Sequence, residues 1–159
     1  MRRKDREIKD KSAIKELLDT AGVLHLGMFD GERPYVVPVN YGYDVIDDSY
    51  QFYIHSAKHG RKIEILEKFN NVFIEIVLDY EIINMGMTPC DLSKKYKCFM
   101  ADGIACRIDD FNEKSRALKL IVKQQTGIIP QELNEKSVDA VHVYRIITEN
   151  ATMKSNIGG

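Results

Sequence analysis

A cluster of bases occupies residues 55–62, which read HSAKHGRK, at a point where an aromatic and β-branched run gives way to a helical pattern. Its bases besides His55 are Lys58, His59, Arg61 and Lys62. The start of a helix favours acidic residues, so bases in a predicted first turn are locally unfavourable. A phosphate would resolve the conflict, because the Ser56 hydroxyl, the Arg61 and Lys62 charges and backbone N–H groups would converge on it, with Gly60 allowing close approach. A solvated basic turn explains the residues equally well, so the motif alone indicates an unspecified anion site.

The residues alone favour structural roles for the histidines over catalytic or metal-binding ones. His55 ends a predicted strand beside Ser56, which favours a capping or partly buried role over a catalytic one. His55 and His59 do not share a face where a strand ends, and no acidic or thiolate side chain adjoins them, so no metal site is predicted. His25 and His142 fall within predicted strands and are interpreted as structural.

The elements that must position the cluster follow from periodicity and turn residues. A first helix is predicted after Asp10 and Ser12, ended by Gly22, and the Asp30-Gly31 pair predicts a hairpin turn. A short helix carries Ile63, Leu66 and Phe69, and a longer one covers 111–123, closed by Gly127 and Pro130. A loop is predicted over 84–94, and strands are predicted over 22–29, 34–44, 50–55, 71–83, 96–108 and 138–147.

Short links between these strands predict an antiparallel barrel, because parallel strands would need a helical crossover between each pair. The predicted fold is mainly β with some α: a six-stranded antiparallel β-barrel with a few flanking helices. Repeats and linkers are absent from the 159 residues, so residues 1–159 are predicted to form one domain.

Charge and composition restrict the partners. The 23 Lys and Arg nearly balance the 24 Asp and Glu, so no global field attracts nucleic acid or an anionic membrane, and neither is predicted as a partner. The basic start is followed by Asp5, Arg6 and Glu7 rather than by an apolar stretch, which predicts a cytoplasmic protein without a signal peptide or membrane span. The cysteines are too far apart for a CxxC site and are interpreted as reduced and structural: Cys90, Cys98 and Cys106.

Four segments in order resemble a known family: MRRKDREI at the start, PYVVPVNYGYD over 34–44, YIHSAKHGRKIEIL over 53–66, and the following Asn70-Asn71-Val72. The chain resembles the nitroimidazole-resistance (Nim-type) branch of the pyridoxamine 5′-phosphate oxidase-like flavin split barrels, from Met1 through the last strand and its tail ATMKS. The resemblance implies a homodimeric split barrel with two flavins, usually FMN, in grooves between the subunits.

The resemblance also implies residue roles. One strand would run along the isoalloxazine and ribityl groups, at Pro38, Val39, Asn40 and Tyr41. The ribityl phosphate and the ring edge would be held by His55, Ser56, Ala57, Arg61 and Lys62. This sequence departs from the family pattern in YKCFMADGIA, where Cys98 and Ala101-Asp102 stand at positions that more often hold serine and glycines.

The implied function is that of a flavin-dependent oxidoreductase, in which the flavin accepts a hydride and passes electrons to a small acceptor such as a nitroaromatic. Water or His55 would supply protons, which makes His55 the candidate catalytic residue. The alternatives are a flavin- or haem-binding protein without turnover and a structural dimer with a vestigial site. Pyridoxamine phosphate oxidation is disfavoured, because Arg145 is the only arginine after Val141. FMN and FAD both remain open.

Overall fold

The structure is a computed structural model that describes residues 3–84, 88 and 92–156. A short 3-10 turn, Lys4–Arg6, precedes the first strand. The helices are α1 (Lys11–Thr20), α2 (Arg61–Leu66), α3 (Phe111–Thr126) and α4 (Glu135–Asp139). The strands are β1 (Glu7–Ile8), β2 (Leu24–Phe29), β3 (Pro34–Val39), β4 (Tyr41–Ile46), β5 (Ser49–Ser56), β6 (Asn71–Asn84), β7 (Leu92–Ile108) and β8 (His142–Asn156).

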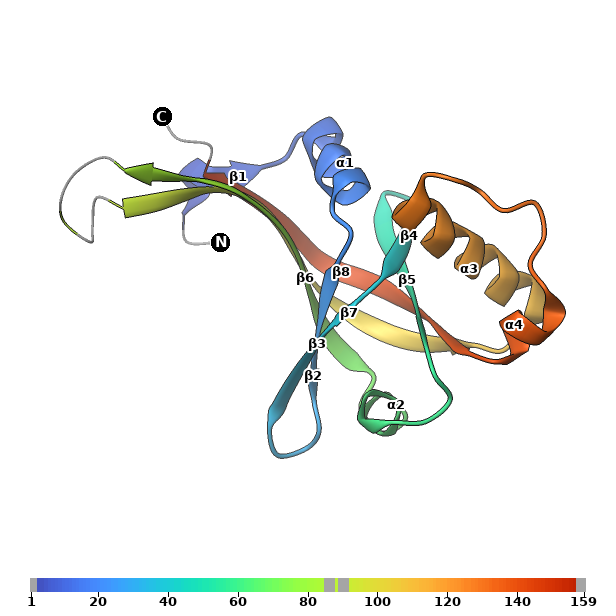
Figure 1. Ribbon diagram of the computed structural model, residues 1–159. Coiled ribbons are helices and arrows are strands. Elements are labelled where there is room, and N and C mark those ends of the chain that lie inside the picture. Colours follow the sequence, from blue (N-terminus) through green and yellow to red (C-terminus); the bar gives the residue numbers. More distant parts are fainter. Residues whose placement is uncertain (1–2, 85–87, 89–91, 157–159) are drawn as a thin grey trace.

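One antiparallel sheet of 8 strands, in the order β3-β2-β6-β7-β8-β5-β4 with β1 added to β8, curves into an open barrel (Figure 1). The predicted class, mainly antiparallel β with a few helices, is confirmed, but the strand count of six is wrong. The stretch predicted as one strand over 34–44 divides at Asn40 into β3, which pairs with β2, and β4, which pairs with β5. The chain thus passes directly from one edge of the sheet to the other, which leaves the barrel split there.

Local signals placed most element ends correctly. Asp10 caps α1 by accepting from the Ser12 N–H at 3.1 Å, and Gly127, with φ 74°, ends α3. The Asp30 turn joins β2 to β3, with Phe29 opposite Pro34. The predicted last strand over 138–147 is displaced: Val138 lies in α4, and β8 begins at His142 and continues through the tail to Asn156.

The loop predicted over 84–94 extends too far at its C-terminal end, because β7 begins at Leu92. Residues 85–87 and 89–91 of that prediction, including Cys90, lie outside the described residues. β7 continues to pair with β8 through a register shift between Met100 and Asp102. The ends of such long strands are set by pairing with segments that are distant in the sequence. The local residue pattern therefore does not predict these ends.

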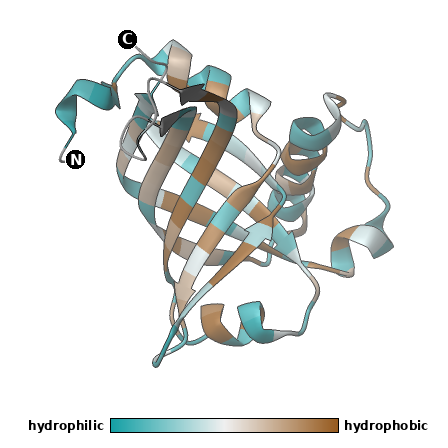
Figure 2. Ribbon diagram, turned by 60° about the vertical axis from the view of Figure 1, so that its left-hand side comes forward, coloured by the Kyte–Doolittle hydropathy of each residue, from teal (hydrophilic) through white to brown (hydrophobic). Residues whose placement is uncertain are grey.

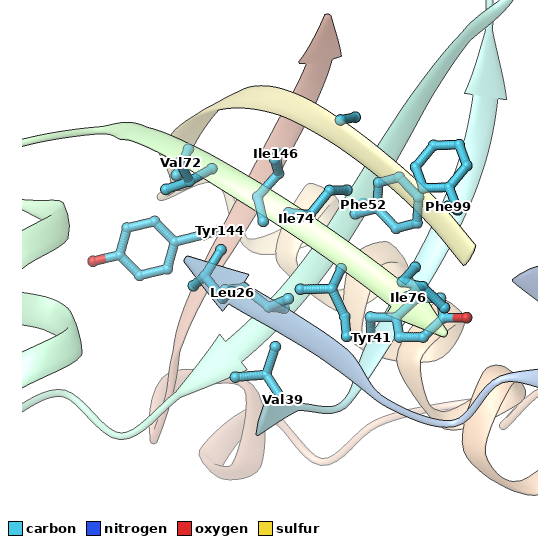
Figure 3. Close-up of a cluster of buried hydrophobic side chains, with 14 of the residues drawn as sticks. Leu26, Val39, Tyr41, Phe52, Val72, Ile74, Ile76, Phe99, Tyr144 and Ile146 are labelled. Carbon is cyan, nitrogen blue, oxygen red and sulfur yellow. The ribbon is translucent and has the colours of Figure 1, made fainter. Parts of the chain in front are cut away.

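Apolar residues alternate with polar ones along the strands (Figure 2). The buried apolar side chains form one cluster inside the barrel. Leu26, Phe52, Ile74, Phe99 and Ile146 are each 0% exposed and come from five different strands (Figure 3). A second cluster joins α3 to the outside of the sheet through Tyr53, Ile108, Ala117, Ile121 and Val143. The β5–β8 region is therefore packed on both of its faces.

Tyr41 ties α1 to the barrel from inside. Its side chain is 0% exposed, and its hydroxyl lies 2.7 Å from the Leu18 carbonyl oxygen and 2.9 Å from that of Ala21, at the end of α1 (Figure 3). We expect Tyr41→Phe to lower the free energy of unfolding by about 1 kcal/mol, because the hydrogen bonds of the hydroxyl are lost while Gln124 Nε2 still donates to both carbonyls, at 2.7 Å and 3.0 Å. Urea unfolding measures this, with Tyr35→Phe as the control; equal values for both variants would contradict it.

Candidate cofactor site

The basic cluster lies between the end of β5 and the start of α2, as the sequence predicted. Gly60 has φ 125° and ψ 165°, a conformation that side chains with a Cβ rarely adopt, and it turns the chain into α2. One expectation is corrected: Lys58 and His59 precede α2 instead of lying in its first turn. Because α2 has only 6 residues, its dipole is weak, so the basic side chains must provide the attraction for an anion.

Arg61 is held by the neighbouring hairpin. Its guanidinium donates to Asp30 Oδ2 at 2.8 Å and lies 4.4 Å from the centre of the Tyr35 ring. The pKa of Asp30 falls to about 2, because the backbone N–H groups of Arg33 and Glu32 and the Arg61 side chain all donate to its carboxylate. Arg61 therefore fastens the β2–β3 hairpin to α2, and an incoming phosphate would have to compete with Asp30 for it.

Lys62 lies close to His55, and its charge acts on the His55 ring. Burial lowers the pKa of Lys62, and burial together with the charge of Lys62 lowers the pKa of His55. His55 Nδ1 is buried and has no hydrogen-bond partner, and among the described residues no carboxylate pairs with Lys62. A half-buried lysine beside an unpaired ring nitrogen is the local electrostatic problem that a bound anion would solve.

The four residues expected to follow a flavin ring, 38–41, point alternately to the inside and the outside of the barrel. Val39 and Tyr41 point into the barrel, at 8% and 0% exposure, while Pro38 and Asn40 are exposed on the outside. β3 is an edge strand, so its outer backbone groups have no sheet partner beyond β2. The backbone at 38–41 and the Pro38 and Asn40 side chains are therefore open to a ligand, and the Tyr41 side chain is not.

The structure thus brings His55 and Lys62 together, with half-buried Ser56 and exposed Ala57 next to them. It assigns Arg61 to a different contact, and it adds Asp30 and Tyr35, which the sequence interpretation had not connected with the cluster. The Asp30-Gly31 turn signal placed the hairpin correctly, but nothing local indicated that the hairpin tip would reach α2.

Two surface grooves adjoin α3 and share Leu120 and Lys123 in their linings. One of about 800 Å³ is formed with α1 and β4, and one of about 460 Å³ follows α3 beside Ile129. Neither is lined by a residue of the predicted flavin site. Within the described part of the chain, no group of three or more potential ligands is arranged to hold a metal ion, and no helix is long and apolar enough to cross a membrane.

The pKa of His55 has a measurable consequence. The folded protein holds the pKa of His55 below its ordinary value of about 6.5. As the pH falls through about 6.5, the unfolded chain therefore binds a proton at this histidine before the folded chain does. We therefore expect the free energy of unfolding to decrease below about pH 6.5, and His55→Gln to flatten that decrease. NMR titration of the His55 ring gives the pKa directly; a midpoint above 6.5 in flavin-free protein would refute the expectation.

Comparisons with known proteins show the family and the fold of the chain. The model of the pyridoxamine 5′-phosphate oxidase family matches residues 10–155. A search of curated proteins finds no match. Among solved structures, a protein from Bacteroides thetaiotaomicron described as a candidate for 5-nitroimidazole antibiotic resistance is 31% identical with a TM-score of 0.79, over 94% of this chain and 86% of that one.

Two more distant structures share the fold. The flavocytochrome Anf3 from Azotobacter vinelandii is 21% identical with a TM-score of 0.77, over 99% of this chain and 72% of that one. The FAD and heme binding protein from Mycobacterium smegmatis is 16% identical with a TM-score of 0.77, over 96% of this chain and 74% of that one.

Proposed function

Because the chain belongs to the pyridoxamine 5′-phosphate oxidase family, a flavin-binding family, we propose that it binds FMN and transfers hydride equivalents to a small electron acceptor. The pair of Lys62 and His55 supports this more than any other feature, since both groups are half-buried and lack an anionic partner among the described residues. The similarity to the protein from Bacteroides thetaiotaomicron favours a nitroaromatic acceptor.

Each residue then has a defined task. Lys62 neutralises the ribityl phosphate, and the Ser56 hydroxyl and the backbone at Ala57 donate to it. The open edge at 38–41 orients the ring system through backbone groups, with Pro38 and Asn40 against it. When bound, the flavin supplies the hydride chemistry. His55 is neutral at neutral pH, because its pKa is lowered, so it contacts the ring edge as a hydrogen-bonding group and water delivers the protons.

We further propose that a second copy of the chain forms the other wall of this site, in a cytoplasmic homodimer. The candidate residues lie at the outside of an open barrel, on an edge strand and a turn, and one chain covers only one side of them. A flavin held there by a single chain would leave much of its apolar ring in water, whereas small-molecule sites bury most of their ligand.

The cofactor is identified from purified protein. We expect a two-band yellow absorption spectrum, an extracted cofactor with the mass of FMN, and the mass of a dimer in solution. After anaerobic reduction, addition of 2-methyl-5-nitroimidazole should restore the oxidised flavin spectrum. An extracted cofactor with the mass of FAD would identify FAD instead of FMN as the cofactor. A Soret band would favour the haem-binding alternative. A colourless protein that fails to bind added flavin would refute the proposal.

A further inference from the structure

A cavity of about 430 Å³ lies where the C-terminal end of α2 meets the paired strands β7 and β8. Its apolar lining comes from Leu66, Ala105 and Tyr144, which are 5%, 4% and 2% exposed. The Ala105 N–H donates to the Asn70 carbonyl oxygen at 2.8 Å, which fastens the turn after α2 to β7. None of the residues assigned to the flavin lines this cavity, so it is a separate candidate site.

The Tyr144 hydroxyl is buried beside this cavity without a partner. Tyr144 belongs to the core cluster, but its hydroxyl points away from the other labelled side chains of that cluster (Figure 3). The hydroxyl oxygen makes no hydrogen bond among the described residues. Burying a hydroxyl without a partner costs stability, and a phenylalanine would fill the same space without that cost. A single water would complete one hydrogen bond, but the cavity is many times larger than the ~30 Å³ that one water occupies.

Charges of both signs surround this hydroxyl. Burial raises the pKa of Tyr144, the Glu67 carboxylate raises it further, and Arg107 opposes the rise, so both charges lie close enough to act on the hydroxyl. Arg107 is directly opposite Tyr144 in the β7–β8 register, so the two side chains leave the sheet on the same face. Arg107 Nε donates to Asp109 Oδ1 at 2.9 Å, and its two terminal nitrogens have no partner in the described part of the chain.

Glu67 and Arg107 both line the cavity, but they form no ion pair with each other among the residues that the structure describes. They are therefore two separate anchoring points of opposite sign. A guanidinium with free terminal nitrogens is suited to a carboxylate, and an unpaired carboxylate is suited to an ammonium group. An ion of one sign would be attracted by one of these groups and repelled by the other, whereas a ligand with both charges satisfies the two together.

We propose that this cavity binds a small zwitterion, an α-amino acid with an aliphatic side chain. Arg107 holds its carboxylate, Glu67 holds its ammonium group, the Tyr144 hydroxyl hydrogen-bonds to one of the two, and the aliphatic part rests on Leu66 and Ala105. The ligand reaches the hydroxyl when the long exposed side chains at the rim turn aside, as exposed side chains do on a nanosecond scale. The inference goes beyond the proposed function and does not depend on bound flavin.

L-leucine is the probe, and calorimetric titration of the purified protein together with ¹H–¹⁵N spectra measures its binding. We expect the amide resonances of Ala105, Cys106 and Arg107 to shift to saturation. L-leucinamide, which lacks the carboxylate, and 4-methylpentanoate, which lacks the ammonium group, should each bind about tenfold more weakly or worse, because each loses a charge-assisted contact.

Two charge variants test the two anchoring points separately. Glu67→Gln should abolish the preference for L-leucine over 4-methylpentanoate, and Arg107→Gln should abolish the preference for L-leucine over L-leucinamide. Glu149→Gln, which removes a carboxylate from the exposed part of β8, is the matched control and should keep both preferences.

Tyr144→Phe separates a ligand-binding hydroxyl from a structural one. We expect this variant to bind L-leucine several times more weakly, while the free energy of unfolding of the protein without L-leucine stays the same or rises, because an unsatisfied buried hydroxyl is removed. A variant that is less stable and binds L-leucine normally would overturn the inference. So would no binding of L-leucine, equal affinities for the three probes, or resonance shifts that leave residues 105–107 unaffected.

Discussion

Lys62→Met is expected to lower the affinity for flavin about a hundredfold, because a charge-assisted contact to a phosphate contributes roughly 1.5–3 kcal/mol. Methionine retains most of the apolar length of the lysine stem, so packing around buried Ile63 is preserved. The same change should raise the free energy of unfolding of the flavin-free protein, since it removes a half-buried cation whose pKa burial lowers. Fluorescence titration with FMN and urea unfolding of flavin-free protein measure the two effects.

The opposite signs of these effects separate a binding role from a structural one. Lys68→Met, an exposed lysine just after α2, is the matched control and should change neither quantity. Arg61→Met should behave differently again: it breaks the contact with Asp30 and the stacking on Tyr35, so hairpin stability falls along with affinity. Unaltered flavin affinity in Lys62→Met would remove the phosphate assignment.

Gly42→Ala is expected to destabilise the protein by about 3 kcal/mol, near the upper end of the usual cost of overpacking. A Cβ at position 42 would lie 2.5 Å from the Leu120 carbonyl carbon and 2.6 Å from the Ile121 N atom, both in the backbone of α3. A helix backbone does not move aside as a flexible side chain does, so α3 must shift away from β4. Urea unfolding measures the cost.

Gly22→Ala is the control for this change, because its Cβ would meet only the Gln125 side chain at 3.8 Å and should alter stability by less than about 0.5 kcal/mol. A shift of α3 would also disturb Arg116, whose guanidinium binds Asp44 and donates to the Tyr53 hydroxyl at 3.1 Å. Equal stabilities for the Gly42 and Gly22 variants would show that α3 packs on β4 less closely than the structure describes.

Local chemistry accounts for the elements that the sequence predicted well. Asp10 and Gly127 act within one turn of the helices that they end, and the Asp30 turn acts within one hairpin. Predictions failed where contacts with distant segments of the chain set the boundary of an element. Asn40 divides two strands because Tyr41 lies opposite Ile54 on β5 while Val39 lies opposite Leu24 on β2. β8 begins later in the chain than predicted because Val138 belongs to the helix α4, where its side chain is buried. The Asn134 side chain caps that helix.

The candidate site shows the same division. The sequence by itself determined that bases gather between a strand and a short helix, that Gly60 among them would allow close approach of the backbone, and that no global charge competes for an anion. Only the tertiary structure decided which base is available: Asp30, 31 positions away along the chain, binds Arg61, whereas Lys62 is half-buried beside His55. The reason is physical, since burial and pairing set the state of a charge, and both depend on which distant segments pack around it.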